Sequence, residues 1–203
     1  MTFYRDHVLP HLIALAMRNR TLVPYRERVV SEATGRILEL GIGSGLNLPL
    51  YGRNASEIIG LEPSPRLVAM ATRRARKMGI PVTFIESSAE AIPIQDRSID
   101  TVVMTWTLCS IPNVLGALSE MRRVLKLGGK LLFVEHGLAP EPGVRRWQDI
   151  LTPYWRRIAG GCHLNRPIQN LIETAGFSVI RLKTGYSPGP KPLTYMYEGC
   201  ALA

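Results

Sequence analysis

The sequence predicts a doubly wound α/β fold, and three observations support this prediction. Short apolar runs alternate with amphipathic segments along the chain, and glycine-rich turns separate several of them. The length of 203 residues suffices for one such domain with a sizeable core, but not for two. Hydrophobic residues make up 46% and charged residues 20% of the chain, which is typical of a globular protein. We therefore expect residues 1–203 to form a single domain.

The first apolar run ends in a glycine-rich turn. Residues 37–40 predict a short buried strand, and Gly41, Gly43 and Gly45 follow it. Glycine permits a tight turn and a close approach of the backbone to a ligand, while the next helix points its N–H groups at that ligand. This arrangement is typical of a nucleotide-type cofactor site, with an ordinary strand-to-helix turn as the alternative.

Two acidic residues flank this turn. Glu39 stands two residues before the first glycine, and Glu62 ends the second predicted strand, where a carboxylate can accept both hydroxyls of a ribose. The glycine spacing departs from the Gly-x-Gly-x-x-Gly pattern of dinucleotide sites, which disfavours an NAD-type dehydrogenase. Residues 39–45 resemble instead the first motif of the class I S-adenosylmethionine-dependent methyltransferases, acidic-x-Gly-x-Gly-x-Gly.

This resemblance implies S-adenosylmethionine as the cofactor and a Rossmann-like sheet of seven mostly parallel strands, of which the last is antiparallel. It also implies a polar side chain and an alanine N–H group at the adenine edge, and Ser88 and Ala89 stand at those positions. The family often has Asp where Ser88 stands. The expected cofactor-binding residues are Glu39, Gly41, Ile42, Gly43, Gly45, Asn47, Glu62, Pro63, Ser88, Ala89, Glu90, Thr105, Trp106 and Leu108.

Apolar periodicity and turn residues place the other elements. The clearest helix follows Glu62, with Ser64 as a plausible N-cap, Pro65 in the first turn and Gly79 as the stop. We expect strands at 37–40, 58–61, 82–85, 101–105, 131–135, 177–183 and 193–201, and helices at 25–33, 65–78, 114–125, 144–158 and 168–175.

Residues 1–34 are expected to form an N-terminal helical lid. Residues 3–19 are amphipathic and are interrupted near Pro10. They are too short and too charged for a membrane span and lack a signal-peptide cleavage pattern. A lid over the cofactor and substrate mouth and a helix on a membrane surface remain the alternatives, and we favour the lid. His7 and His11 share a helix face, but no third metal ligand stands near them.

The C-terminal third is expected to select the methyl acceptor, through an insertion at residues 137–168. His136 and His163 are candidate general bases because an imidazole titrates near neutrality. Arg166 either binds an anionic acceptor or caps backbone carbonyls. The expected catalytic residues are His136, His163 and Arg166, and the expected substrate-binding residues are Trp147, Trp155, Cys162 and Asn165.

Motifs in this third resemble more narrowly the alkyl thiol methyltransferases of the methyltransferase-like-seven family. They are the segment 135–137, the Trp-rich helix, the segment 161–166 and the segment 195–199. The resemblance implies a small-molecule acceptor, first of all a thiol or another soft nucleophile. Three alternatives remain open: phospholipid or quinone methylation at a membrane surface, arsenite methylation by converging thiols, and a catalytically silent S-adenosylmethionine-binding module.

Cysteine count and charge limit the remaining classes. Cys109, Cys162 and Cys200 are few, scattered and odd in number, which favours a reducing, cytoplasmic compartment over a disulfide framework. No cysteine pair has zinc spacing, so the sequence predicts no metal site. The net charge of +9 favours anionic partners, but the basic residues fall on expected helices without interleaved aromatics. We therefore expect no nucleic acid, at most a weak contact with a membrane surface, and a monomer or homodimer.

Overall fold

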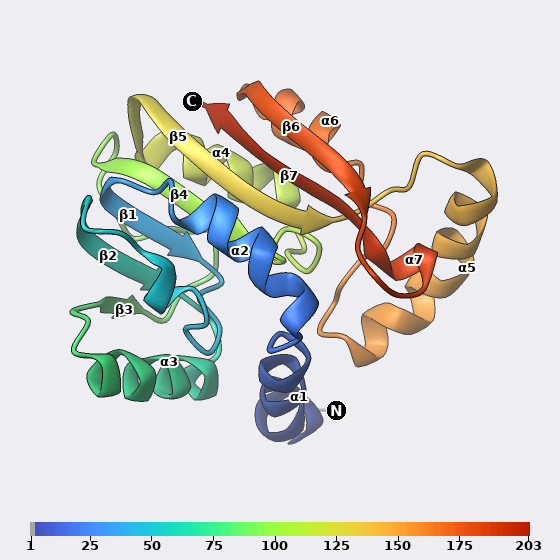
Figure 1. Ribbon diagram of the computed structural model, residues 1–203, viewed down its shortest axis with the longest axis horizontal. Coiled ribbons are helices and arrows are strands. Elements are labelled where there is room, and N and C mark those ends of the chain that lie inside the picture. The colour runs from blue at the N-terminus through green and yellow to red at the C-terminus, as the bar shows by residue number, and fades with distance from the viewer. Residues whose placement is uncertain (1–2) are drawn as a thin grey trace.

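A computed structural model describes residues 3–203, so Met1 and Thr2 of the expected lid lie outside the described residues. Within that range one seven-stranded sheet runs in the order β3-β2-β1-β4-β5-β7-β6, and helices lie against its two faces (Figure 1). The strands are β1 (Gly35–Leu40), β2 (Ala55–Leu61), β3 (Thr83–Ile85), β4 (Ile99–Thr105), β5 (Leu125–His136), β6 (Ser178–Tyr186) and β7 (Tyr195–Leu202).

Strand pairing confirms the predicted fold class. Strands β1 to β5 pair in parallel, whereas β7 is antiparallel to both β5 and β6. Strand β1 has β2 on one side and β4 on the other, with Leu38 opposite Ile59 and Val102. The chain first adds strands on one side of β1 and then on the other, so the strand order switches direction between β1 and β4. Ligands of open parallel sheets bind at such a switch point, outside the carboxyl ends of the strands.

The helices agree with the expected positions to within a few residues. Helix α3 begins and ends where predicted, and Gly79 stops it with a φ of +67°. Ser64 stands at the N-cap position, but its side chain makes no capping bond; its backbone N–H donates to Glu62 instead. The α-helices are α1 (Leu9–Ala16), α2 (Val23–Val30), α3 (Pro65–Met78), α4 (Val114–Val124), α5 (Pro142–Ile158), α6 (Ile168–Thr174) and α7 (Lys191–Thr194).

Several strand boundaries differ from the prediction by a few residues, and the start of β5 differs most. Strand β5 begins at Leu125 rather than at 131, because the segment expected to turn already pairs with its neighbour: Ile99 lies opposite Leu125 and Thr101 opposite Lys130, with a bulge between them. The loop expected at 187–192 contains the start of α7, and β7 therefore begins at Tyr195. Neither change affects the carboxyl ends of β1, β2 and β4.

The core lies on both faces of the sheet. Consecutive residues of a strand point to opposite faces, so Val102 belongs to the apolar cluster that contains Leu118 of α4, and Val103 to the cluster that contains Val29 of α2. Cys200 lies in the second cluster. Burial on both faces explains why the central strands are continuous apolar runs rather than alternating ones.

The N-terminal segment, a π-helical turn at Tyr4–Val8 followed by α1, lies between α3 and α5 (Figure 1). The Tyr4 hydroxyl donates to the carbonyl of Ile158 at the end of α5, 2.8 Å away, and the Arg66 guanidinium of α3 contacts the His7 ring. In the described part of the chain, none of the helices combines the length and the apolar character needed to cross a bilayer.

Candidate active site

The glycine turn adopts a conformation that requires glycine. Gly41, Gly43 and Gly45 have φ values of +64°, +55° and +74°, a region that L side chains rarely adopt. A Cβ atom at Gly41 would collide with Thr107, and one at Gly45 would lie 2.9 Å from Leu48. A Cβ atom at Gly43 would have only the Gly41 carbonyl oxygen within 4 Å, at 3.8 Å. Gly43 is thus the position where a ligand can approach the backbone.

Glu62 lies directly beside this turn. Its two carboxylate oxygens accept the N–H groups of Gly43, at 3.2 Å, and of Ser64, at 3.0 Å. Burial raises the pKa of Glu62, whereas the two backbone bonds lower it. The carboxylate therefore stands at the carboxyl end of β2, next to the open side of Gly43, as expected for a group that holds ribose hydroxyls.

Glu39 has a different position. It is buried, and its oxygens accept the Asn47 amide at 2.8 Å and the Tyr51 hydroxyl at 2.7 Å. Arg26 donates to Asn47 at 2.7 Å, and Thr105 accepts from Asn47 at 3.0 Å. Burial raises the pKa of Glu39 to about 7 and lowers that of Arg26 to about 10. The Glu39 oxygens thus bind Asn47 and Tyr51, which follow the glycine turn; Arg26 and Tyr51 were not predicted.

The segment after β4 lies against the end of β1 and the first glycine of the turn. Trp106 has a φ of +51°, which is rare for a bulky residue and often marks a functional site. The Arg26 guanidinium lies 4.7 Å from the Trp106 ring centroid. The Thr107 hydroxyl donates to the Leu40 carbonyl at 3.1 Å. Residues 105–107 therefore form a fixed wall beside the end of β1.

The expected adenine edge is a closed local turn. The Ser88 hydroxyl donates to Glu90 at 3.0 Å, and the second Glu90 oxygen accepts the N–H of Asn113 at 2.6 Å. Ala89 is buried in the core, so only its backbone can meet a ligand. Of the other expected cofactor residues, Pro63 is exposed, whereas Ile42 and Leu108 are buried.

Three side chains that are distant in the sequence meet beyond the end of β5. The Nε2 atom of His136 lies 3.0 Å from the Cys162 sulfur, and Cys109 completes a cluster of three buried residues. Burial lowers the pKa of His136, but Cys109 and Glu135 outweigh this effect and raise it. Glu135 accepts the N–H groups of residues 107 and 108 at 2.7 and 2.9 Å, and burial raises its pKa to about 8. Cys109 and Glu135 were not predicted as site residues.

Arg166 and His163 hold the loop that carries Cys109. Arg166 is buried and donates to the carbonyls of Leu108 and Ile111, which is the carbonyl-capping alternative of the sequence prediction. It also lies 3.1 Å from Nδ1 of His163. The His163 backbone N–H donates to the Cys109 carbonyl at 2.8 Å. Burial and Arg166 lower the pKa of His163, and its Nδ1 lies 3.1 Å from the Cys109 carbonyl oxygen as well.

Helix α5 brings only some of the expected acceptor residues to this cluster. Gln148 is buried and donates to the carbonyls of Gly137 and Leu164, each at 2.9 Å. Trp147 precedes it by one residue, which turns it about 100° around the helix, and it is 59% exposed. Asn165 donates to Asp149 instead. Cys109 and Trp155 lower the pKa of the Cys162 thiol, so Trp155 lies beside the cluster. The structure thus brings neither Trp147 nor Asn165 to the cluster, and the contacts of Gln148 were not predicted.

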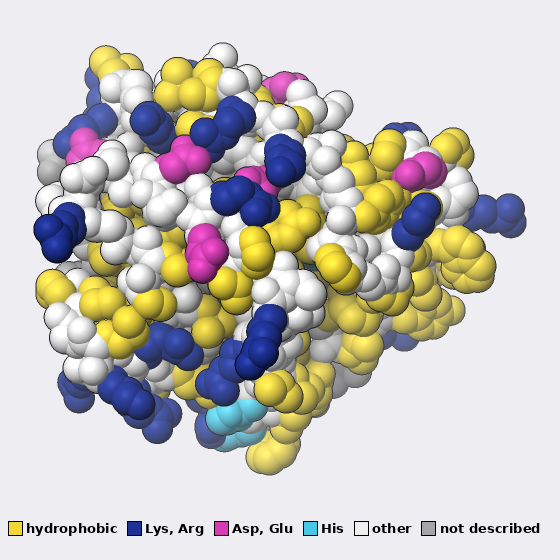
Figure 2. All heavy atoms as spheres, viewed as in Figure 1, with side chains coloured by type: hydrophobic (Ala, Val, Ile, Leu, Met, Phe, Trp, Pro, Cys, Tyr) yellow, Lys and Arg dark blue, Asp and Glu magenta, His cyan; other side chains and the backbone are white. Residues whose placement is uncertain are grey.

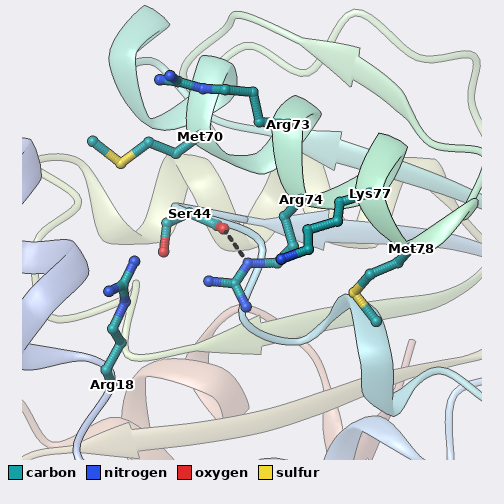
Figure 3. A pocket seen from close by; sticks show the side chains of 7 residues that line it. All are labelled: Arg18, Ser44, Met70, Arg73, Arg74, Lys77 and Met78. Carbon is teal, nitrogen blue, oxygen red and sulfur yellow. Dashed lines mark hydrogen bonds between the residues drawn. The ribbon is translucent and has the colours of Figure 1, made fainter.

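A hollow of about 500 Å³ opens between the glycine turn and α3 (Figure 3). The Arg74 guanidinium donates to the Ser44 carbonyl there, at 3.1 Å. The cationic lining suits an anion, and none of the residues 109, 136 and 162 takes part in it. The lining residues are Arg18, Ser44, Met70, Arg73, Arg74, Lys77 and Met78.

The sheet order with its reversed last strand, and the carboxylate beside an open glycine turn, define the class as a Rossmann-like methyltransferase. The family described as "Methyltransferase domain" matches residues 38–133. A structure of an S-adenosylmethionine-dependent methyltransferase from Aquifex aeolicus superimposes with a TM-score of 0.67, covering 95% of this chain and 97% of the other at 20% identity. This similarity concerns the fold.

Curated relatives give a closer comparison. Human thiol S-methyltransferase TMT1B is 30% identical over 94% of this chain and 82% of its own length. Phosphatidylethanolamine N-methyltransferase of Cereibacter sphaeroides is 34% identical over 79% of this chain and 78% of its own length. The chain spans 64% of the length of rat TMT1B, to which it is 34% identical over 76% of itself. The chain belongs to the S-adenosylmethionine-dependent methyltransferases, and its similarity to the thiol S-methyltransferases confirms the resemblance of its C-terminal motifs.

Proposed function

We propose that this chain transfers the methyl group of S-adenosylmethionine to the sulfur of a small thiol. One observation carries the proposal: the segment 105–111 contacts the glycine turn through Thr107 and the candidate acceptor residues through Cys109. The cofactor turn and the soft, buried cluster therefore share one short connection. The names of the human and rat relatives point to the same acceptor class.

The proposed roles of the cofactor residues follow from their surroundings. Glu62 accepts the ribose hydroxyls, the backbone at Gly43 approaches the cofactor, and residues 88–90 bind the adenine edge. Residues 105–107 line the reacting centre. Glu39 acts indirectly, because its oxygens hold Asn47 and Tyr51.

Two segments are proposed to enclose the acceptor. Residues 1–34 act as a lid, since the described part of this segment contacts α3 and α5 on opposite sides of the mouth. Residues 137–168 act as the acceptor-site insertion, since Cys162 and Trp155 belong to it. Enclosure excludes water from a reaction whose activated methyl group comes with the cofactor.

The protein must then align the acceptor and take up its proton. His136 and His163 are the candidate bases. His136 lies in the buried cluster, and the Nδ1 atom of His163 lies 3.1 Å both from the Cys109 carbonyl oxygen and from Arg166. A thiol suits such a site because its sulfur needs few hydrogen bonds from the protein.

A turnover screen with labelled cofactor tests the proposal. The acceptors are small thiols, phenols, quinones, phospholipid vesicles and arsenite, and we expect methylation of thiols at the highest kcat/KM. Gly43→Val should abolish turnover and cofactor binding, because a β-branched residue cannot take the φ of +55° without strain. Gly52→Val is the matched control, since a Cβ atom at Gly52 has no neighbour within 4 Å. Turnover of another acceptor class without thiols would refute the thiol assignment.

A lipophilic acceptor at a membrane surface is the second candidate function, and one observation favours it. Helix α5 exposes apolar side chains, and so does the N-terminal segment beside it. Figure 2 shows apolar atoms gathered around the α5 end of the molecule. The exposed apolar residues are Phe3, Val8, Leu12 and Leu15 in the N-terminal segment, and Trp147, Ile150, Leu151, Tyr154 and Ile158 on α5. Arginines on α5 could contact anionic lipid headgroups.

A further inference from the structure

The cluster of Cys109, His136 and Cys162 combines ligands from three separate segments. Cys109 follows β4, His136 ends β5, and Cys162 follows α5. Their ligand atoms all lie within 4.8 Å of one another. The residues are 3%, 9% and 8% exposed, respectively. A metal site built from three segments has no short sequence spacing, which is why the sequence predicted none.

The surroundings hold this cluster in place. Before Cys109, the N–H of residue 108 donates to Glu135. After it, Arg166 donates to the carbonyl of Ile111. The carbonyl of Cys109 itself accepts from His163. Rigid backbone supports of this kind are typical of sites that must present ligands in one geometry.

We propose that Cys109, His136 and Cys162 bind one zinc ion through two sulfurs and one imidazole nitrogen, and leave a fourth position open. Zn–S bonds of about 2.3 Å and Zn–N bonds of about 2.0 Å separate tetrahedral ligand atoms by about 3.5–3.8 Å. The observed His136–Cys162 separation of 3.0 Å and the upper limit of 4.8 Å bracket that value. Small side-chain rotations therefore suffice to form the site.

Charge and donor type favour zinc at this place. Two thiolates and a neutral imidazole compensate a divalent cation, so the buried site as a whole is neutral. The Nε2 atom of His136 is the nitrogen that faces the sulfur. Three protein ligands are the usual number for catalytic zinc, whereas structural zinc takes four.

Arsenite fits these residues less well. It prefers three thiols, and the third cysteine, Cys200, lies in the apolar cluster with Val29 and Val30 of α2. Cys200 pairs with Leu132 in the middle of β5, whereas His136 ends that strand. The cluster offers two thiols and one imidazole, and this ligand set suits zinc better than it suits arsenite.

The open position gives the site a role that rests on the proposed function. A thiol that binds zinc loses its proton to solvent and stays as the thiolate. During transfer, the bond from the acceptor sulfur to the methyl carbon forms as the bond from that carbon to the sulfonium sulfur breaks. An acceptor held as thiolate therefore needs no separate base. Cys109 is two residues from Thr107, so their Cα atoms lie within about 7.6 Å, and Thr107 contacts the glycine turn.

Zinc binding is tested with the full chain, purified under reducing conditions, stripped with a chelator and titrated with Zn²⁺ alone. We expect close to one ion per chain, and Co²⁺ in its place should give a sulfur-to-metal charge-transfer band. Cys162→Ser and His136→Ala should weaken zinc binding by at least about tenfold. Cys200→Ser is the matched control and should bind like the unchanged protein. Equal affinity in Cys162→Ser and Cys200→Ser would overturn the proposal.

A second measurement on the unchanged protein covers variants that fail to fold. Zn²⁺ should slow alkylation of Cys109 and Cys162, mapped by mass spectrometry, and leave the rate at Cys200 unaltered. Equal rates with and without Zn²⁺ would also overturn the site. The two proposals can fail separately. Zinc binding without thiol turnover would support the zinc site and refute the thiol acceptor. Thiol turnover that survives chelation would support the thiol acceptor and refute the zinc site.

Discussion

Arg26 is the residue whose replacement tests the described site most directly. It is 6% exposed and donates to Asn47 at 2.7 Å and to the Met17 carbonyl at 3.3 Å, while it stacks on Trp106. A hydrogen bond from a charged donor contributes about 1.5–3 kcal/mol, and a cation–π contact about 0.5–2 kcal/mol. Arg26→Met keeps most of the volume and regains part of the cost of burying the charge. We expect a net loss of about 3 kcal/mol in the free energy of unfolding.

Thermal unfolding measures this loss, with Arg28 as the control on the same helix. A chain of this length loses about 2–4 °C of Tm per kcal/mol, so Arg26→Met should lower Tm by about 6–12 °C. Arg28 forms an exposed ion pair with Glu198 at 2.7 Å, and such pairs contribute about 0–1 kcal/mol. Arg28→Met should therefore shift Tm by less than about 4 °C. Equal shifts for the two variants would refute the assignment of Arg26 to a buried network.

Three other predictions concern cofactor binding, pH and membranes. Glu62→Ala should weaken S-adenosylmethionine binding at least about tenfold by calorimetry, since it removes charged hydrogen bonds of about 1.5–3 kcal/mol each; Glu57→Ala, on the exposed part of β2, is its control, and an unchanged Kd would place the ribose elsewhere. Burial holds the pKa of Glu39 at about 7 in the folded state, against about 4.3 unfolded. The folded state therefore binds more protons between these values, and stability falls by about 4 kcal/mol as pH rises through them. Glu39→Gln should flatten this fall in urea unfolding, and an unaltered slope would contradict the argument. The unchanged protein should co-sediment with anionic vesicles more strongly than Trp147→Glu does, because Trp147 is 59% exposed on α5. If neither protein binds the vesicles, the proposed membrane-surface function is wrong.

Arg166, which the sequence analysis singled out, and Gln148, which it did not, have the same kind of partner. The side chains of Arg166 and Gln148 donate their hydrogen bonds to backbone carbonyls. These bonds hold the segments that carry Cys109 and Cys162. Variants at Arg166 should therefore lower turnover through the geometry of the loop.

The sequence by itself determined the fold class and the placement of the glycine turn and Glu62 at neighbouring strand ends. Apolar runs, glycines and carboxylates at strand ends are local patterns, and the ends of parallel strands meet at one edge of the sheet whatever the side-chain details. Gly43 and Glu62 could be identified in this way. Gly79 could likewise be identified as the end of α3, because a glycine after a helical pattern is a local signal.

Only the tertiary structure decided which side chains meet in the acceptor half. The rotation of α5 turns Gln148 inward and leaves Trp147 exposed, which depends on what the helix packs against and not on its composition. Arg26 is one of several arginines on its helix, and its burial follows from the position of Trp106 and Asn47. Cys109, His136 and Cys162 converge because three loops end at one point. Contacts between distant segments arise from packing, so no spacing along the chain encodes them.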